Sequence, residues 1–159
     1  MTTEEYLFSS AVKVISFDFD DTLALSKLTK STDPNETRPV ILFPSGYWIS
    51  EDVPNPPIVD LAKRLHNVGK ELHIVTYRTH GWAEECYEFC KKCGITIKAI
   101  HATAGNSKVT FLQKIKADCH IDDDIMTCTE IFNTDITPIL VKQPCHTSNS
   151  TLKLFKYIL

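Results

Sequence analysis

Three aspartates lie within four residues near the start of the chain, in the stretch VISFDFDDTLA at positions 14–24. Asp18, Asp20 and Asp21 directly follow residues 14–17, which read as a buried strand. Carboxylates held this close repel one another, and burying a charge without a partner is costly. A strand that ends in this way needs a partner that neutralises the carboxylates, and the rest of the chain must supply it.

Polar groups suited to the same chemistry follow three later apolar runs of the chain. They are Thr76 and Arg78, then Asn106, Ser107 and Lys108, and finally Asp122, Asp123 and Asp124. Ligands of parallel α/β sheets bind at the carboxyl ends of the strands, so these groups should converge with Asp18, Asp20 and Thr22 on one rim. A crevice lined by carboxylates favours a hard cation, and we expect Mg²⁺.

The elements that would position these groups alternate between strands and helices. Apolar runs predict strands at 12–17, 71–77, 96–102, 118–124 and 136–142. Helical spacing of apolar residues predicts helices at 56–70, 81–94, 107–117, 125–133 and 150–159. This alternation predicts a three-layer α/β/α sandwich with a mainly parallel five-stranded sheet, in a single domain over 1–159.

One insert, about 26–57, interrupts this alternation and is rich in Thr, Asp, Asn and Pro. Apolar runs on both sides of Pro44-Ser45-Gly46 predict a short hairpin, 41–49. We expect this hairpin to be a flap over the crevice, where the rings of Tyr47 and Trp48 could stack on a base or line an apolar pocket. The alternative is that the same rings attach the hairpin to the sheet as a small satellite core.

The strand-end motifs, taken together, resemble those of the haloacid dehalogenase superfamily of phosphohydrolases. SFDFDDTLA is similar to the first motif and LHIVT to the second, while Lys108 fits the third and HIDDD the fourth. The resemblance extends from residue 14 to residue 124. It implies that Asp18 is a nucleophile forming an aspartyl-phosphate, and that Asp20 is first the general acid and then the general base.

The resemblance also implies how the other residues take part. Mg²⁺ would be held by Asp18, by the backbone carbonyl of Asp20, and by Asp122 and Asp123. Phosphate would be bound by Thr76 and Lys108. Candidate substrate contacts are Thr22, Arg78, Tyr47 and Trp48.

Several of these residues have a second interpretation. Lys114 and Lys116 are alternatives to Lys108, and Arg78 could form an ion pair with a carboxylate of the rim instead of reaching substrate. Asp21 and Asp124 are read as turn or cap residues. The remaining candidates are read as buried side chains, in preference to a zinc set or catalytic groups: Cys86, Cys90, Cys93, His73 and His120.

The substrate class stays open at this level. The insert leaves room for at most a reduced cap, and an open crevice suits a nucleotide or a large substrate such as a nucleic-acid end. The Thr76-x-Arg78 loop and HIDDD also resemble the phosphatase half of polynucleotide kinase-phosphatases and small deoxynucleotidases. The alternatives are a small-metabolite or protein phosphatase or phosphotransferase and, more remotely, a non-catalytic binding module on the same fold.

Composition narrows the range of partners. The chain has 159 residues, of which 43% are hydrophobic and 23% charged, which suits one globular domain. A net charge of -3 argues against an extended nucleic-acid-binding face. We expect no membrane span, no signal peptide and a cytoplasmic location, with the six cysteines reduced. The oligomeric state does not follow from the sequence.

Overall fold

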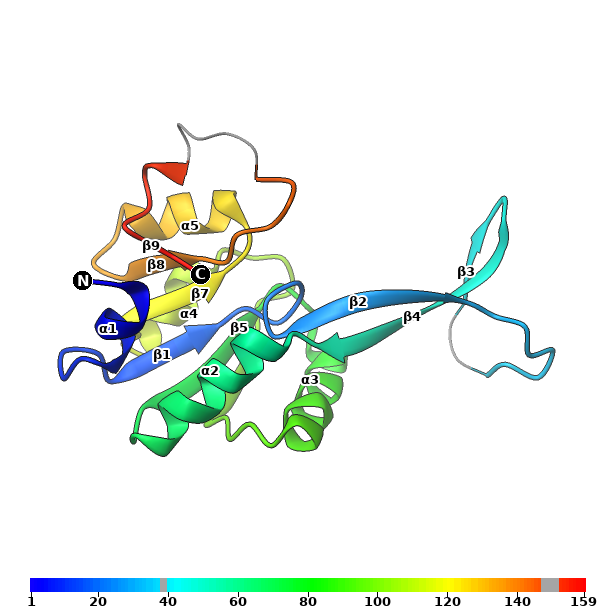
Figure 1. Ribbon diagram of the computed structural model, residues 1–159, viewed down its shortest axis with the longest axis horizontal. Helices are drawn as coiled ribbons and strands as arrows, with labels where there is room; N and C mark the ends of the chain where they lie inside the picture. The colour runs from blue at the N-terminus through cyan, green and yellow to red at the C-terminus, as the bar shows by residue number, and fades with distance from the viewer. Residues whose placement is uncertain (38–39, 147–151) are drawn as a thin grey trace.

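The structure of the protein is a computed structural model that describes residues 1–37, 40–146 and 152–159. Its helices are α1 (Thr3–Phe8), α2 (Pro56–Asn67), α3 (His80–Cys93), α4 (Lys108–Lys114) and α5 (Ile125–Phe132). Its strands are β1 (Val14–Phe17), β2 (Ala24–Lys30), β3 (Val40–Phe43), β4 (Gly46–Pro54), β5 (Glu71–Thr76), β6 (Ala99–Ala102), β7 (Cys119–Asp122), β8 (Thr137–Leu140) and β9 (Tyr157–Ile158). Figure 1 shows their arrangement.

The central sheet has six parallel strands in the order β6-β5-β1-β7-β8-β9. β1 lies in the interior of the sheet, and successive strands are added first on its β5 side and then on its β7 side. The chain therefore leaves β1 and β7 in opposite directions. The junction between these two strands is the switch point at which sheets of this kind bind ligands.

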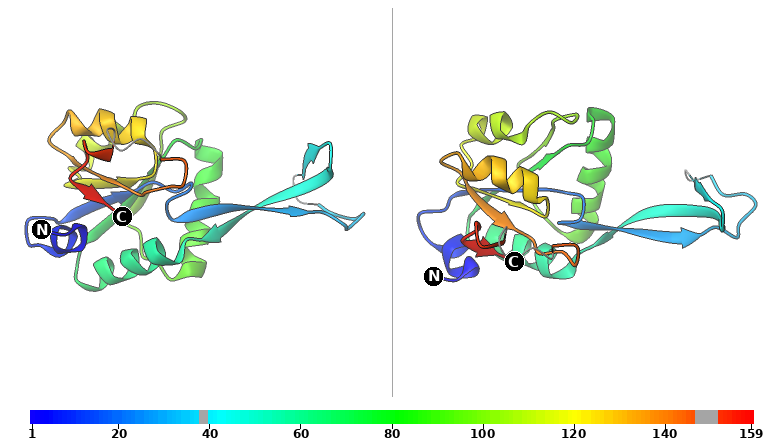
Figure 2. Two further views of the ribbon diagram at one scale, coloured as in Figure 1. Left: turned by 45° about the horizontal axis from the view of Figure 1, so that its top comes forward. Right: turned by 90° about the horizontal axis from the view of Figure 1, so that it is seen from above.

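Helices cover both faces of this sheet and complete three layers (Figures 1 and 2). Side chains of α1, α2 and α3, including Leu7, Leu61 and Phe89, pack with Ile15 on one face. α4 contributes Leu112 to a second cluster on the opposite face, where α5 also packs. The predicted α/β/α sandwich with a mainly parallel sheet is confirmed.

The prediction of five strands and a closing helix at 150–159 is wrong for the part of this segment that the structure describes. Tyr157 and Ile158 instead form β9, which pairs with β8. The Tyr157 ring is buried and stacks on Tyr6, with ring centroids 4.3 Å apart. This long-range packing holds the segment extended, and it outweighs the local helical spacing of its apolar residues.

α1 is a helix that the sequence reading missed, although its start carries a recognisable signal. Thr2 and Glu5 form a capping box, in which Thr2 Oγ1 accepts a hydrogen bond from the Glu5 backbone N–H and the Glu5 carboxylate accepts one from the Thr2 N–H. α2, by contrast, begins at Pro56 as expected and buries the predicted apolar face.

The insert forms a separate antiparallel sheet in the order β2-β4-β3, which we call the arm. β2 pairs with β4 from Ala24↔Pro54 to Lys30↔Trp48, so the two strands form one long ribbon. Figures 1 and 2 show this ribbon extending away from the central sheet, with β3 at its far end. Most of β2 falls in the insert, where the only strands that we expected were those of the hairpin at 41–49.

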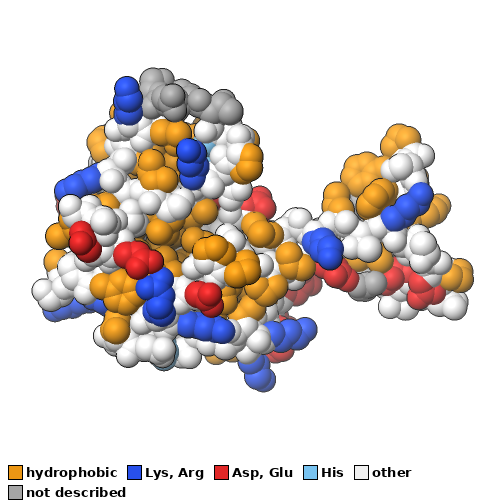
Figure 3. Space-filling model, viewed as in Figure 1, with side chains coloured by type: hydrophobic (Ala, Val, Ile, Leu, Met, Phe, Trp, Pro, Cys, Tyr) orange, Lys and Arg blue, Asp and Glu red, His pale blue; other side chains and the backbone are white. Residues whose placement is uncertain are grey.

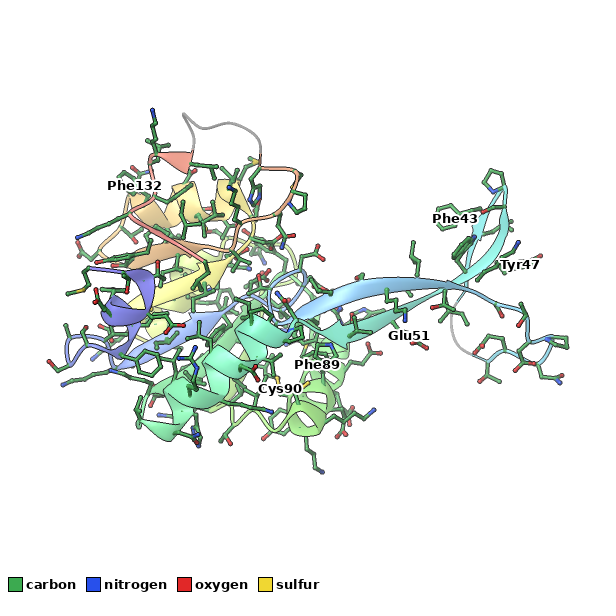
Figure 4. All side chains as sticks on the ribbon, viewed as in Figure 1. Phe43, Tyr47, Glu51, Phe89, Cys90 and Phe132 are labelled. Carbon is green, nitrogen blue, oxygen red and sulfur yellow. The ribbon has the colours of Figure 1, made fainter. Side chains whose placement is uncertain are left out.

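The tip of the arm does not form the flap that we predicted over the crevice. Figure 4 places Phe43 and Tyr47 at the far end of the arm, and Figure 3 shows hydrophobic side chains gathered there. Leu42 is 70% and Tyr47 57% exposed, so these side chains are not attached to the core either. The continuous pairing of β2 with β4 is the physical reason, because it carries the hairpin outward.

Candidate active site

The carboxyl ends of β1 and β7 bring three aspartates together. Oxygen atoms of Asp18, Asp122 and Asp123 all lie within 4.8 Å of one another. Asp18 follows β1, Asp122 ends β7, and the two strands are in register through Phe17 and Ile121. Asp18 also continues the ladder, since its N–H donates to the Ile121 carbonyl at 2.8 Å. The sheet register thus fixes the distance between these carboxylates.

Lys108 is the cation that the structure places inside this cluster. Its Nζ lies 2.8 Å from Asp18 Oδ1 and 2.7 Å from Asp122 Oδ2, and its side chain is 1% exposed. Lys108 is the first residue of α4, whose N-cap is Ser107, so the helix start aims the side chain into the crevice. The alternative Lys114 is exposed in the last turn of the same helix.

The charges of the cluster do not balance, because one lysine faces three carboxyl groups. Burial, and next the charge of Asp122, raise the pKa of Asp18 well above its usual range. Burial and Asp122 likewise raise the pKa of Asp123 to about 7. Burial by itself would lower the pKa of Lys108, but Asp18 and Asp122 outweigh it and keep the ammonium charged. The cluster therefore retains protons that a bound cation would displace.

These residues fit a hard divalent cation. All three side chains offer carboxylate oxygens, which are the ligands that Mg²⁺ prefers. The single positive charge of Lys108 does not neutralise three carboxylates, so a cation would supply the missing charge. Thr22 lies at the edge of the cluster, with its hydroxyl 3.4 Å from Asp18 Oδ2 and 3.5 Å from Asp123 Oδ1. The part expected of the Asp20 backbone carbonyl stays a prediction.

The side chain of Asp20 is engaged by Arg78. Arg78 Nε and Nη2 donate to the two Asp20 carboxylate oxygens at 3.0 and 2.6 Å, and Nη2 also lies 3.3 Å from both oxygens of Asp52 in β4. The guanidinium stands over the Phe19 ring, 4.7 Å from its centroid. Of the two interpretations of Arg78, the structure displays the ion pair. Asp52, which links the arm to this pair, was not foreseen.

The remaining predicted contacts divide into two groups. Thr76 ends β5, the strand beside β1, and its buried hydroxyl accepts a hydrogen bond from the Arg78 N–H at 3.2 Å. Tyr47 and Trp48 lie in the arm, and the structure does not bring them to the acidic cluster. Contact of these two residues with substrate stays a prediction.

Two acidic residues beside the cluster have the turn and cap roles expected of them. Asp21 has a left-handed backbone with φ 59°, which Asp tolerates, and its N–H donates to the Ala24 carbonyl at 2.7 Å. Asp124 is the N-cap of α5 and accepts hydrogen bonds from the N–H groups of Met126 and Thr127.

The cysteines that could have bound zinc are dispersed in packing roles. Cys86 and Cys90 are buried against the core face of α3, and burial raises the pKa of each thiol to about 12. Among the described residues, the Asp18 cluster is the group of three or more potential metal ligands that the fold assembles.

His120 is a site residue whose role sequence reasoning missed. It was read as a core or sheet-face residue, and it is indeed fully buried. Its Nε2, however, lies 2.8 Å from Asp122 Oδ2, and its Nδ1 lies 2.9 Å from the Ser16 hydroxyl. A signal was present, because residues two apart in a strand project from the same face and Asp122 comes two residues after His120.

Comparison with known proteins gives the fold its context. No protein-family model matches the chain, and no curated protein matches it in sequence. A solved structure similar to it is 3-deoxy-D-manno-octulosonate 8-phosphate phosphatase from Moraxella catarrhalis, in complex with magnesium, phosphate and KDO. The TM-score is 0.57 at 17% identity, over 99% of this chain and 80% of that one.

A second similar structure, from Pseudomonas syringae pv. phaseolica, is named as a YrbI-family phosphatase. It has a TM-score of 0.57 at 15% identity, over 99% of this chain and 79% of that one. At these identities the likeness defines the fold, which this chain shares with both phosphatases.

No helix among the residues that the structure describes is long and apolar enough to cross a membrane.

Proposed function

We propose that the protein is a Mg²⁺-dependent phosphomonoester hydrolase. The observation that carries the proposal is the position of Asp18, a buried carboxylate held between Lys108 and the Asp122–Asp123 pair at the switch point of the sheet. A nucleophile placed against both a cation and a metal-binding pair is what transfer of an anionic phosphoryl group needs. Phosphatases among the structural neighbours agree with this proposal.

In the proposed hydrolysis, Asp18 and Asp20 carry out the chemical steps. Asp18 Oδ1 accepts from Lys108, whereas Oδ2 lies 3.4 Å from the Thr22 hydroxyl, so we assign the attack on phosphorus to Oδ2. An O–P bond forms to Asp18 while the bond from phosphorus to the leaving oxygen breaks, and Asp20 gives that oxygen a proton. Water then attacks the aspartyl-phosphate, Asp20 accepts its proton, and inorganic phosphate leaves. Mg²⁺, held by Asp18, Asp122 and Asp123, would neutralise the carboxylates and the transferring phosphoryl group.

Asp20 must change partners to do this. Both of its carboxylate oxygens accept hydrogen bonds from Arg78, so neither oxygen faces a leaving group in this arrangement. Proton transfer therefore requires Asp20 to turn out of the ion pair toward the leaving group. Its side chain is 45% exposed, which leaves space for that rotation.

For the substrate we propose a small phosphorylated metabolite. The Moraxella catarrhalis enzyme, which is named for a sugar-acid phosphate, supports this class by analogy. A nucleotide or a polynucleotide terminal phosphate is the alternative. Its main support from the sequence was base stacking by Tyr47 and Trp48, and that support is weakened because both residues lie in the arm.

The test is phosphate release from p-nitrophenyl phosphate and from sugar phosphates, nucleotides, phosphopeptides and 3′- or 5′-phosphorylated oligonucleotides. We expect turnover that requires Mg²⁺, is lost in EDTA and is abolished in an Asp18→Asn variant that keeps its fold. Turnover that survives EDTA, or that Asp18→Asn retains, would contradict the mechanism. Preference for oligonucleotides would favour the alternative substrate class.

A further inference from the structure

A buried chain of hydrogen bonds leads from the sheet interior to the acidic cluster. Ser16 in β1 and His120 in β7 are both 0% exposed, and the two residues are directly paired in the sheet register. Ser16 Oγ lies 2.9 Å from His120 Nδ1, and His120 Nε2 lies 2.8 Å from Asp122 Oδ2. The function as proposed so far uses neither Ser16 nor His120.

The direction of each hydrogen bond follows from the chemistry of the three groups. Asp122 Oδ2 accepts a hydrogen bond from the Lys108 ammonium at 2.7 Å, as an oxygen of an ionised carboxylate does. An ionised carboxylate can only accept, so Nε2 of His120 carries the hydrogen. A neutral imidazole with its hydrogen on Nε2 has an unprotonated Nδ1, and this atom lies 2.9 Å from the Ser16 hydroxyl. Nδ1 therefore accepts from the Ser16 hydroxyl.

This arrangement leaves the two oxygens of Asp122 in different states. Oδ2 accepts from Lys108 Nζ at 2.7 Å and from His120 Nε2 at 2.8 Å, so both of its lone pairs are used. Oδ1 accepts from the Asp124 N–H at 3.0 Å and keeps one lone pair. A cation in the cluster would therefore be bound through Oδ1.

We propose that His120, oriented by Ser16, is a positioning residue that fixes the rotation of the Asp122 carboxylate and so presents Oδ1 to the divalent cation. The inference rests on the proposed function, because it assumes that Asp122 is a metal ligand. It assigns His120 no proton transfer and no contact with substrate. Groups that hold a metal-ligating carboxylate in this way typically change metal affinity about 10–100-fold when removed.

The experiment compares Mg²⁺ affinity by isothermal titration calorimetry, without substrate, in wild type, His120→Leu and His120→Gln. Leucine removes the hydrogen bond to Asp122, and we expect the dissociation constant to rise about 10–100-fold. Glutamine carries an amide N–H that can replace Nε2–H, so it should restore most of the affinity. In turnover assays, the Mg²⁺ concentration for half-maximal rate should rise in His120→Leu, while kcat at saturating Mg²⁺ changes little.

His73→Leu is the matched control. His73 lies in β5 opposite Ser16, is 4% exposed and has both ring nitrogens hydrogen-bonded, to Glu71 and His101. Its loss should lower the melting temperature about as much as His120→Leu and leave Mg²⁺ affinity unchanged. Ser16→Ala, which frees the far side of the His120 ring, should weaken Mg²⁺ binding less than His120→Leu does.

The outcomes separate the inference from the proposed function. Equal Mg²⁺ affinity in wild type and His120→Leu overturns the role of His120, and the metal site itself stands. A wild type that binds no Mg²⁺ overturns both. If His120→Leu does not fold, the comparison of Ser16→Ala with His73→Leu decides, and equal affinity in these two variants refutes the positioning role.

Discussion

Replacing Lys108 with methionine should destabilise the metal-free protein strongly, because its ammonium group is the buried partner of two carboxylates. The variant loses hydrogen bonds of 2.8 Å to Asp18 and 2.7 Å to Asp122. Hydrogen bonds to charged groups contribute about 1.5–3 kcal/mol each, so the pair suggests about 3–6 kcal/mol. Removing one partner of a buried ion pair costs about 3–5 kcal/mol, and we take that range.

The loss of stability in Lys108→Met should be larger at high pH than at low pH. Burial and Asp122 already raise the pKa of Asp18, and without Lys108 that pKa rises further. A carboxyl group whose folded-state pKa exceeds its unfolded value favours the folded state only while it is protonated. Protonation at pH 5 therefore offsets part of the loss, whereas at pH 8 the full cost is present.

The assay is thermal and urea unfolding of Lys108→Met without metal, at pH 5 and pH 8. For a chain of this size, 3–5 kcal/mol corresponds to a fall in melting temperature of roughly 6–20 °C. Lys114→Met, which changes an exposed lysine at the other end of α4, is the control and should melt near wild type. A Lys108→Met variant that melts within about 2 °C of wild type at pH 8 would refute the view that Lys108 neutralises the cluster.

Three further outcomes are expected. Asp20→Asn should lower kcat about 10²–10⁴-fold at an unchanged melting temperature, and near-normal turnover would argue against Asp20 as the proton donor. Because the pKa of Asp123 is raised to about 7 in the fold, the metal-free protein should lose stability as the pH rises from roughly 4 to 7. Asp123→Asn should flatten this part of the plot of stability against pH. An unchanged slope in the variant would contradict the assignment to Asp123. Tyr47→Ala and Trp48→Ala, at the tip of the arm, should shift the melting temperature by less than about 2 °C, since neither ring belongs to the central core; a larger fall would show that the arm is part of the cooperative fold.

Most of the central sheet could be predicted because its main strands can be recognised from their own residues. β1, β5 and β7 are buried on both faces, so they read as short apolar runs, and the residue that ends each run identifies the rim. The meeting of Asp18 with Asp122 then follows from the general rule for parallel sheets. The position of Lys108 at the start of α4 could be reasoned in the same way.

The elements that escaped prediction depend on partners far away in the sequence. β2 is mostly exposed and is held by its pairing with β4, so its own residues show no core-facing pattern. The segment 150–159 has apolar residues at helical spacing, and its residues Tyr157 and Ile158 form β9 because the edge of β8 is available for pairing. The contact between Arg78 and Asp52 could not be predicted, because it depends on the direction in which the arm leaves the central sheet. No local sequence pattern specifies that direction.

The interior position of β1 has a consequence for how the chain comes to be active during its synthesis. β1 emerges early, but the two strands that flank it, β5 and β7, are made much later, and β7 brings Asp122. Until then the apolar β1 has neither neighbour, and such unpaired strands are prone to aggregation. A nascent chain that stops before residue 122 would hold the Asp18 carboxylate without its principal metal partner. On the proposed function, incomplete chains should therefore be inert toward phosphate esters, because the carboxylate cluster assembles only when most of the sheet has been made.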